Sequence, residues 1–241
     1  PDEVSRTLSA PEVRRRAIDG VLSVAFREIA LRVLGLLGNL VLARLLTPKE
    51  FGVFAFGYTL IALAGFIADG GLGAKLIQRT EEPTMPQLRS LHGVTLLASF
   101  AALALTAAIG LPFGLPGRIA TLMACSLPLS ALRAPTTVLA ERRMLYAPIV
   151  RADIVQTISY NVIAIGLVLV GLGVWGLAIA VVVSTVTGTI FLLTVGPVGF
   201  IRPSFSLRHV RPFLSYGFQF QAVGVVSTLR DHGLNLAAAG V

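Results

Sequence analysis

Long runs of apolar residues, separated by short polar segments, dominate this sequence. No Asp, Glu, Lys or Arg occurs between Ile154 and Ile201, a run of 48 residues. As one helix this run would extend about 72 Å, whereas the hydrocarbon core of a bilayer is about 30 Å thick. We therefore predict two membrane-spanning helices here, with a break at GLGVWG, residues 171–176.

The same pattern along the whole chain predicts an all-α, polytopic membrane bundle of about seven helices. Strands of a membrane barrel are about ten residues long and alternate in polarity, and these apolar runs do not alternate. Turn residues separate the runs, as in TPKEFG (47–52) and GPVGF (196–200), because proline and glycine end helices. The predicted helices cover residues 20–46, 50–72, 90–111, 118–141, 149–171, 175–197 and 212–240.

The distribution of Lys and Arg predicts the orientation of this bundle. Thirteen of the 20 Lys and Arg residues fall in the N-terminal tail and in the loops after the second, fourth and sixth predicted helices. Only Arg44, Lys49 and Arg118 fall on the opposite side. Because basic residues concentrate in cytoplasmic loops, the N-terminus is predicted to be cytoplasmic.

Composition agrees with a membrane protein and limits its partners. Only 13% of the residues are charged and the mean hydropathy is +0.82, whereas soluble domains carry about 25% charged residues. The formal net charge of +8 lies in short loops beside apolar helices, where anionic lipid headgroups suffice as partners. We therefore expect contact with the lipid bilayer and no nucleic acid. A single cysteine, Cys125, excludes an internal disulfide and cysteine-based metal sites.

The glycine-rich stretch ADGGLGAKLIQR, residues 68–79, poses a choice between a phosphate-binding loop and a helix exit. It follows a predicted helix and not a strand, Leu76 stands where a dinucleotide motif requires its third glycine, and no Gly-Lys-Ser/Thr follows. We interpret it as the cytoplasmic exit of the second helix, with Lys75 and Arg79 at the membrane interface.

Several stretches together resemble a known transporter family. LARLLTPKEFGVFAF (42–56) followed by ADGGLGAKLIQR is similar to the signature of the polysaccharide-transporter branch of the multidrug/oligosaccharidyl-lipid/polysaccharide exporter superfamily. APTTVLAERRMLYAPIVRADI (134–154), LVGLGVWGLAIA (169–180) and RPSFSLRHVRPFLSYGFQFQ (202–221) resemble its later links and turns. The resemblance covers essentially the whole chain, but these stretches are signatures of a fold and do not identify a substrate.

The resemblance implies a flippase of the bacterial inner membrane that moves lipid-linked oligosaccharide, of the undecaprenyl-pyrophosphate type, by alternating access. It implies no enzyme activity and no cofactor, and it makes a polysaccharide polymerase and glycosyltransferases candidate partners. Family members have two six-helix lobes, so this chain is expected to be a fragment that holds the first lobe and the beginning of the second. The alternatives are the product of a truncated gene and a chain that must pair with another. The expected division is a basic cytoplasmic tail (1–19), a six-helix bundle (20–197), and a cytoplasmic link with the first helix of the second lobe (198–241).

Charged and polar residues inside the first predicted helix are candidates for a cargo cavity. Glu28 and Arg32 are spaced as a helical ion pair, and Gly35, Asn39 and Ala43 continue the same face. This face is expected to line a cavity that meets the sugars and pyrophosphate of the cargo. The alternative is a buried ion pair within a seam of small residues that packs against another helix.

Later helices supply the remaining candidates. Arg133 lies between Pro128 and Pro135, where it could bind the cargo phosphate or instead satisfy carbonyl groups freed by the prolines. In the fifth predicted helix, Gln156 and Tyr160 share one face and could bind sugar hydroxyls or bond to neighbouring helices. The candidate cavity residues are therefore Glu28, Arg32, Asn39, Arg133, Gln156 and Tyr160.

Other functions remain open at the level of the sequence. A cation-coupled multidrug exporter of the same superfamily would require buried carboxylates, of which Glu28 is the candidate. A non-transporting membrane assembly subunit is a further alternative. A membrane-embedded transferase is disfavoured because no loop is long enough for a catalytic domain and no catalytic or metal-binding constellation is found.

Overall fold

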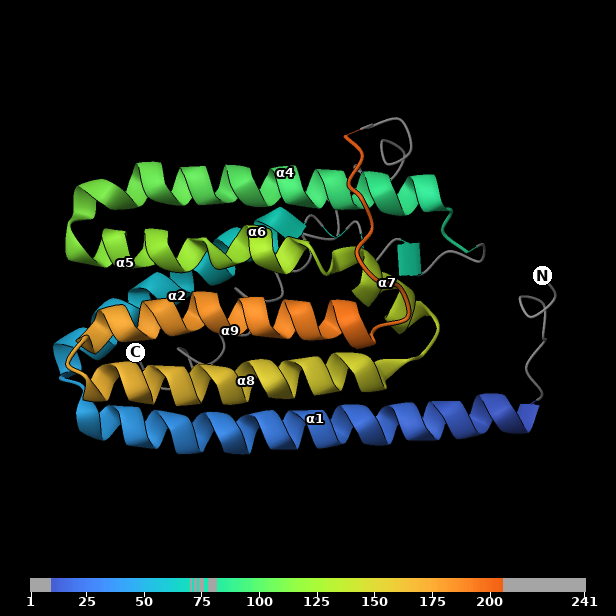
Figure 1. Ribbon diagram of the computed structural model, residues 1–241, viewed down its shortest axis with the longest axis horizontal. Helices are drawn as coiled ribbons and strands as arrows, with labels where there is room; N and C mark the ends of the chain where they lie inside the picture. Colours follow the sequence, from blue (N-terminus) through green and yellow to red (C-terminus); the bar gives the residue numbers. More distant parts are fainter. Residues whose placement is uncertain (1–9, 70, 72, 74–75, 78–81, 206–241) are drawn as a thin grey trace, which may run out of the picture.

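The computed structural model describes residues 10–205, apart from residues 70, 72, 74–75 and 78–81, and side chains from Glu28 onward except those of Ile67 and Asp69. All regular secondary structure within these residues is helical (Figure 1). The chain runs through α1 (Ala10–Leu45), α2 (Pro48–Asp69), α4 (Met85–Gly110), the short 3₁₀ helix η1 (Leu111–Phe113), α5 (Leu115–Ala124), α6 (Ser126–Ala131), α7 (Ala134–Arg142), α8 (Tyr146–Leu169) and α9 (Gly173–Val195).

Four of the described helices are long and apolar enough to cross a membrane, namely those at Pro48–Phe66, Met85–Phe113, Tyr146–Leu169 and Gly173–Val195. A fifth span results if the bent pair Leu115–Ala131 and Ala134–Arg142 counts as one. Multi-pass membrane insertion agrees with the sequence prediction. The first helix begins at Ala10 and not at residue 20, and its half beyond Arg27 carries Glu28, Arg32 and Arg44. The seventh predicted helix, 212–240, lies outside the described residues.

The fourth predicted helix differs most from the sequence prediction. The expected continuous helix over 118–141 is interrupted after Ala124 and again after Ala131, and the second break bends the axis by 51°. Pro128 and Pro135 cannot donate the backbone hydrogen bonds that would continue the helix. The amide of Arg133 instead bonds the carbonyl oxygen of Ser130 at 3.2 Å, which is a tighter turn. Arg133 therefore lies at the bend itself and not within a regular helix.

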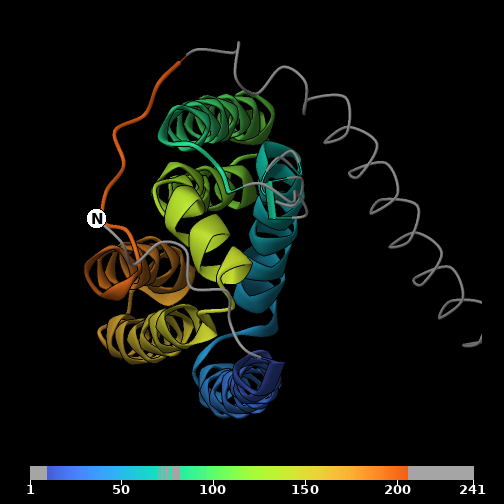
Figure 2. The ribbon, with the colours of Figure 1, turned by 90° about the vertical axis from the view of Figure 1, so that its right-hand side faces the viewer.

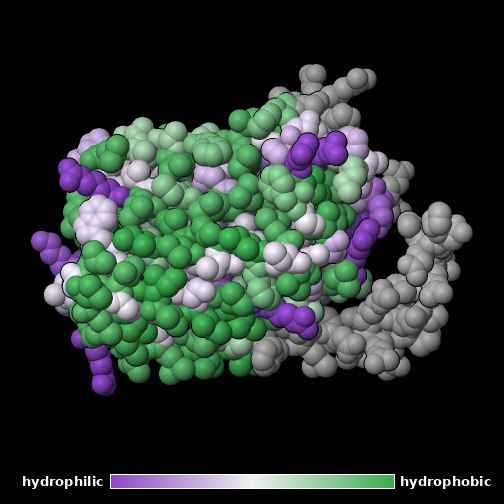
Figure 3. Space-filling view, in the orientation of Figure 1, coloured by the Kyte–Doolittle hydropathy of each residue, from purple (hydrophilic) through white to green (hydrophobic). Residues whose placement is uncertain are grey.

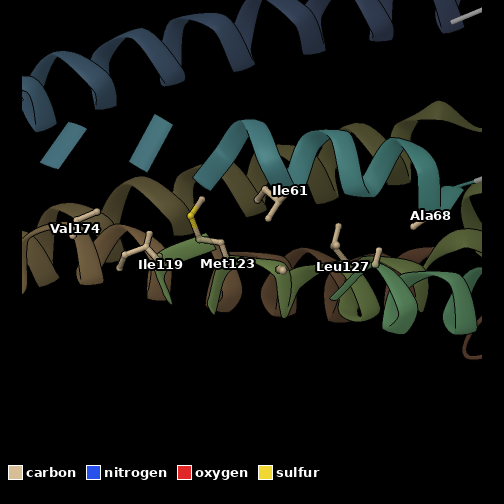
Figure 4. Close-up of a cluster of buried hydrophobic side chains, with 9 residues drawn as sticks. Ile61, Ala68, Ile119, Met123, Leu127 and Val174 are labelled. Carbon is tan, nitrogen blue, oxygen red and sulfur yellow. The ribbon is translucent and has the colours of Figure 1, made fainter. Parts of the chain in front are cut away.

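The helices form a bundle with α1 at one edge and α4 at the other (Figures 1 and 2). α8 packs between α1 and α9, while α2, α4 and α5 pack against one another. The largest core cluster joins α2, α4, α5, α6 and α9 (Figure 4). Its centre is formed by fully or nearly fully buried Ile61, Ile119, Met123, Leu127 and Val174.

One face of the molecule shows a broad apolar belt over the helices, with polar side chains gathered at the two ends (Figure 3). Leu36, Leu40, Leu105 and Ile109 are among the exposed apolar side chains of the molecule. Such a continuous apolar surface exceeds what soluble proteins expose and fits a hydrocarbon environment.

At the end of the bundle predicted to face outward, one side chain ties two helix starts together. Thr47 and Glu50 form a reciprocal cap at the start of α2, in which both the amide and the hydroxyl of Thr47 donate to Oε2 of Glu50, at 2.9 and 2.8 Å. The carboxylate also accepts a bond from the backbone of Val174 at the start of α9. Gly173 has φ +51° and has no room for a Cβ beside Glu50. Glu50 therefore links the start of α2 to the start of α9.

At the opposite end, the segment 198–205 crosses α4 and α7. We call this segment the strap. The hydroxyl of Thr136 donates to the carbonyl oxygen of Val198 at 2.9 Å, Nδ1 of His92 contacts that of Ile201 at 2.5 Å, and the amide of Ser204 donates to that of Arg89 at 2.8 Å. Because a carbonyl oxygen only accepts, Nδ1 of His92 carries the proton. The strap is thus fixed to the bundle before the chain reaches residue 206.

Candidate functional site

A cavity of about 680 Å³ lies between α1, α2, α8 and α9, beside the bend at Arg133. Its walls combine apolar and aromatic side chains with many hydroxyl and amide groups. We call it the cargo cavity, after the cavity that the sequence analysis expects, and it is lined by Leu31, Gly35, Asn39, Phe51, Phe54, Ala55, Tyr58, Thr59, Arg133, Asp153, Gln156, Thr157, Tyr160, Asn161, Val181, Ser184 and Thr185. Apolar and aromatic surface combined with convergent polar groups is typical of ligand sites.

The charged centre of the cavity is Arg133. Its Nη1 donates to Oε1 of Gln156 at 3.0 Å and lies 3.7 Å from Oδ1 of Asp153. The two charged side chains are 25% and 15% exposed, so the ion pair is largely shielded. The break between α6 and α7 brings Arg133 to this place, while Asp153 lies about two turns after the start of α8.

The hydroxyl groups of the cavity wall donate to their own helices. Thr59 donates to the carbonyl oxygen of Ala55, Thr157 to that of Asp153, and Thr185 to that of Val181, at 2.8–2.9 Å. Each hydroxyl oxygen keeps lone pairs that can accept a further hydrogen bond. These three hydroxyl oxygens therefore offer acceptors to a ligand, beside the rings of Phe54 and Tyr58, whose centres are 6.0 Å apart.

Two further cavities meet the first at Arg133. One, of about 420 Å³, extends toward the end of the bundle predicted to be cytoplasmic and is also lined by Glu141, Tyr146 and Asp153. The other, of about 460 Å³, lies among α2, α4, α6 and α7. Arg133 is thus positioned where a polar route from the end of α7 would join the cargo cavity.

The structure brings four of the six predicted site residues together. Asn39, Arg133, Gln156 and Tyr160 all line the cargo cavity although they come from three separate parts of the chain. Neither Glu28 nor Arg32 lines it. Their side chains form an ion pair of 4.0 Å on the outside of α1 and are 53% and 81% exposed, so the alternative of a buried ion pair does not hold within the described residues.

Asp153 and Tyr58 are among the cavity residues that the sequence analysis missed. Asp153 precedes Gln156 by three residues and Tyr160 by seven, so helical spacing places all three on one face. That spacing is a signal that could have identified Asp153. Tyr58 lies inside an apolar helix and has no polar residue three or four positions away on either side. The sequence therefore contained no comparable signal for it.

No group of three His, Cys, Asp or Glu side chains within the described part of the chain could hold a metal ion. The cargo cavity offers a ligand hydrogen-bonding groups, aromatic faces and one ion pair.

Comparison with known protein families matches residues 41–239 to the family described as polysaccharide biosynthesis protein. The comparisons with curated proteins and with solved structures give no match. The matched range covers most of the 241 residues and contains every stretch that carried the resemblance seen in the sequence. The chain therefore belongs to this polysaccharide biosynthesis and export family, which is a family of membrane transporters.

Proposed function

We propose that the chain takes part in moving a lipid-linked saccharide across the membrane, with the cargo cavity as the binding site for the sugar. The observation that carries this proposal is a cavity of about 680 Å³, rich in hydroxyl and amide groups, among helices long enough to span a bilayer. Family membership supports a saccharide cargo in general terms. The lipid tail would remain in the bilayer along the apolar outer surface of the helices.

The alternative of a cation-coupled multidrug exporter receives less support from the geometry. An organic cation would be stabilised by net negative charge in the cavity. The lining instead pairs its acid, Asp153, with Arg133 at 3.7 Å. A polar but electrically balanced wall is better suited to hydroxyl-bearing sugar rings.

The test is a flipping assay with the whole chain reconstituted into liposomes that contain a fluorescent lipid-linked disaccharide. A membrane-impermeant glycosidase added outside trims only the outer leaflet, about half of the probe when nothing flips. Flipping should carry trimming toward completion, and Arg133→Gln should slow it at least about tenfold, since a shielded charged contact contributes over 1 kcal/mol. Arg151→Gln, an exposed change on α8 away from the cavity, should leave it unchanged.

Two outcomes of this assay would count against the proposal. Trimming that never rises above the protein-free level would show that the chain alone does not flip the probe. Equal rates for the wild type and Arg133→Gln would remove the cargo cavity from the mechanism. Active extrusion of ethidium from the same liposomes under an ion gradient would favour the drug-exporter alternative.

The orientation proposed with this function places the N-terminus and the strap on the cytoplasmic side of a bacterial inner membrane. After Cys125→Ser, single cysteines at Phe113 and Thr84 can be compared, since both positions are exposed and lie at opposite ends of α4 and η1. In intact cells an impermeant thiol reagent should label position 113 and not position 84. The reverse pattern would contradict the orientation.

A further inference from the structure

The cargo cavity is electrically balanced, although it contains an arginine. Of its lining residues, Arg133 is the one cation and Asp153 the one anion, and their side chains lie 3.7 Å apart. All other lining residues are uncharged. Gln156 holds the same guanidinium nitrogen, Nη1, at 3.0 Å from its Oε1. Arg133 therefore already has two partners from α8 before any ligand arrives.

This balance affects what the cavity can bind. An anionic group that enters would find a guanidinium whose charge is compensated, and it would also face the carboxylate of Asp153. Like charges at a few Å in a partly shielded site repel strongly. An uncharged sugar ring meets no such repulsion, and its hydroxyl groups can donate to the oxygens of Thr59, Thr157 and Thr185, which have already used their own protons within their helices.

We propose that Asp153 determines the charge selectivity of the cargo cavity, so that uncharged saccharide head groups are bound in preference to acidic ones. This inference rests on the proposed function, because it assumes that the cavity is the saccharide site. Asp153 acts here both through Arg133, whose charge it compensates, and directly, by repelling a carboxylate or phosphate from the sugar-binding wall.

The inference predicts opposite effects for the two members of the pair. Asp153→Asn removes the one anion of the cavity lining, so the lining becomes net positive and acidic head groups gain affinity. Arg133→Gln removes the one cation of the lining, so the lining becomes net negative and acidic head groups lose affinity further. With one unit charge changed at a few Å in a partly shielded site, each ratio of affinities should move by about tenfold. A role of Asp153 in folding alone would not move the ratio in opposite directions.

The experiment uses a matched pair of photoreactive probes, dodecyl glucoside and dodecyl glucuronide, each with a diazirine at the first carbons of the alkyl chain. The two probes differ only in the group at sugar carbon 6, which is a hydroxymethyl in one and a carboxylate in the other. They are added at low mole fraction to phosphatidylcholine vesicles that contain the chain. Mass spectrometry then measures the labelling of peptides from α2 and α8 relative to a lipid-facing peptide of α4.

The wild type should prefer the glucoside several-fold. Asp153→Asn should shift the glucoside-to-glucuronide ratio about tenfold toward the glucuronide, and Arg133→Gln should shift it the other way. The double variant Asp153→Asn, Arg133→Gln should return close to the wild-type ratio. Glu82→Gln, which removes an exposed acid from an ion pair of 3.5 Å with Arg143, and Arg151→Gln serve as matched controls and should leave the ratio unchanged.

An unchanged ratio in folded Asp153→Asn would overturn the inference. If Asp153→Asn does not accumulate, Arg133→Gln and the double variant are compared instead. Equal glucoside-to-glucuronide ratios in these two variants would also overturn the inference. Absence of labelling on α2 and α8 above the α4 level in the wild type would instead remove the saccharide site itself, which is a failure of the proposed function. Labelling by both probes with equal ratios in all variants would contradict charge selectivity alone.

Discussion

Two ion pairs in this molecule each join a carboxylate to an arginine, but their surroundings differ. Glu28 and Arg32 lie four residues apart on α1, at 4.0 Å, and more than half of each side chain is exposed. Asp153 and Arg133 lie twenty residues apart, join α8 to the bend before α7 at 3.7 Å, and are both largely shielded. The second pair lines the cargo cavity and the first does not.

The difference shows that the spacing of residues along a helix predicts an ion pair but does not predict whether that pair is exposed or shielded. A helical i, i+4 pair forms wherever the helix forms, and when exposed it contributes only about 0.3–0.5 kcal/mol. A shielded pair between distant elements depends on the whole bundle, and losing one partner leaves an uncompensated charge that is far more costly. Function is thus better sought at the pair whose geometry the tertiary fold creates.

The largest expected effect is on the shielded pair. Arg133→Gln and Asp153→Asn should each lower the free energy of unfolding in mild detergent by about 2–3 kcal/mol, because each leaves one charge shielded from water without its counter-charge. The double variant should recover much of this loss, which gives a coupling energy of about 1–3 kcal/mol. Denaturation monitored by circular dichroism measures all four corners of the cycle.

The same cycle on Glu28→Gln and Arg32→Gln provides the internal control. Its coupling energy should stay below about 0.5 kcal/mol, since the pair is exposed. Equal coupling energies in the two cycles would contradict the claim that shielding strengthens the Asp153–Arg133 pair.

A smaller effect is expected where α1 is held against α8. A Cβ at Gly38 would collide with Oδ1 of Asn161, whose Nδ2 donates to the carbonyl oxygens of Leu34 and Thr157 at 3.3 and 3.1 Å. Gly38→Ala should therefore displace the amide, weaken these bonds and destabilise the chain by about 1–2 kcal/mol. Gly35→Ala is the matched control, because nothing lies within 4 Å of its Cβ position.

This prediction concerns both regions, because α1 carries the exposed ion pair and also forms one wall of the cargo cavity. If Gly38→Ala weakens glucoside labelling while Gly166→Ala does not, the α1–α8 seam sets the width of the cavity, because Gly166 lies on α8 outside the cavity lining and has nothing within 4 Å of its Cβ position. Equal melting behaviour of the two variants would contradict the close packing at Gly38.

The smallest effect is expected for Arg32→Gln on its own. The side chain is 81% exposed and does not reach the cargo cavity, so stability should change by less than about 0.5 kcal/mol. The ratio of glucoside to glucuronide labelling should stay at the wild-type value. A shift of that ratio as large as the one expected for Arg133→Gln would place Arg32 in the path of the head group.

Much of the fold was predictable because long apolar runs have few alternatives in a membrane. The helices α2, α4, α8 and α9 occupy the predicted stretches within a few residues at each end. The fourth predicted helix was wrong in its continuity, although its prolines were recognised. A proline inside a helix can produce a mild kink or a full break, and the outcome depends on neighbours that satisfy the freed groups.

The site residues on α8 were largely predictable from the sequence, whereas their contacts with other elements were less so. Gln156 and Tyr160 share a face by helical spacing alone. The bond of Gln156 to Arg133 and the approach of Asp153 require the bend at Arg133, which brings the ends of two helices together. The sequence pattern of a single helix does not predict a contact between two distant elements. The pair on α1, in contrast, is predicted by the spacing of its residues within one helix.

The strap has a consequence for which substitutions the chain can tolerate. Within residues 10–205 as described, the three polar bonds that hold it use main-chain atoms of the strap: the carbonyl oxygens of Val198 and Ile201 and the amide of Ser204. The side chains that make these bonds, Thr136 and His92, belong to the bundle. Strap side chains other than Val198 and Ile201, which pack in the apolar core, and Phe200, whose ring meets that of His92 edge to face, are therefore expected to vary while the path of the strap stays the same. Gly93, whose Cβ position is filled by the backbone of Ser204, cannot vary without displacing that path.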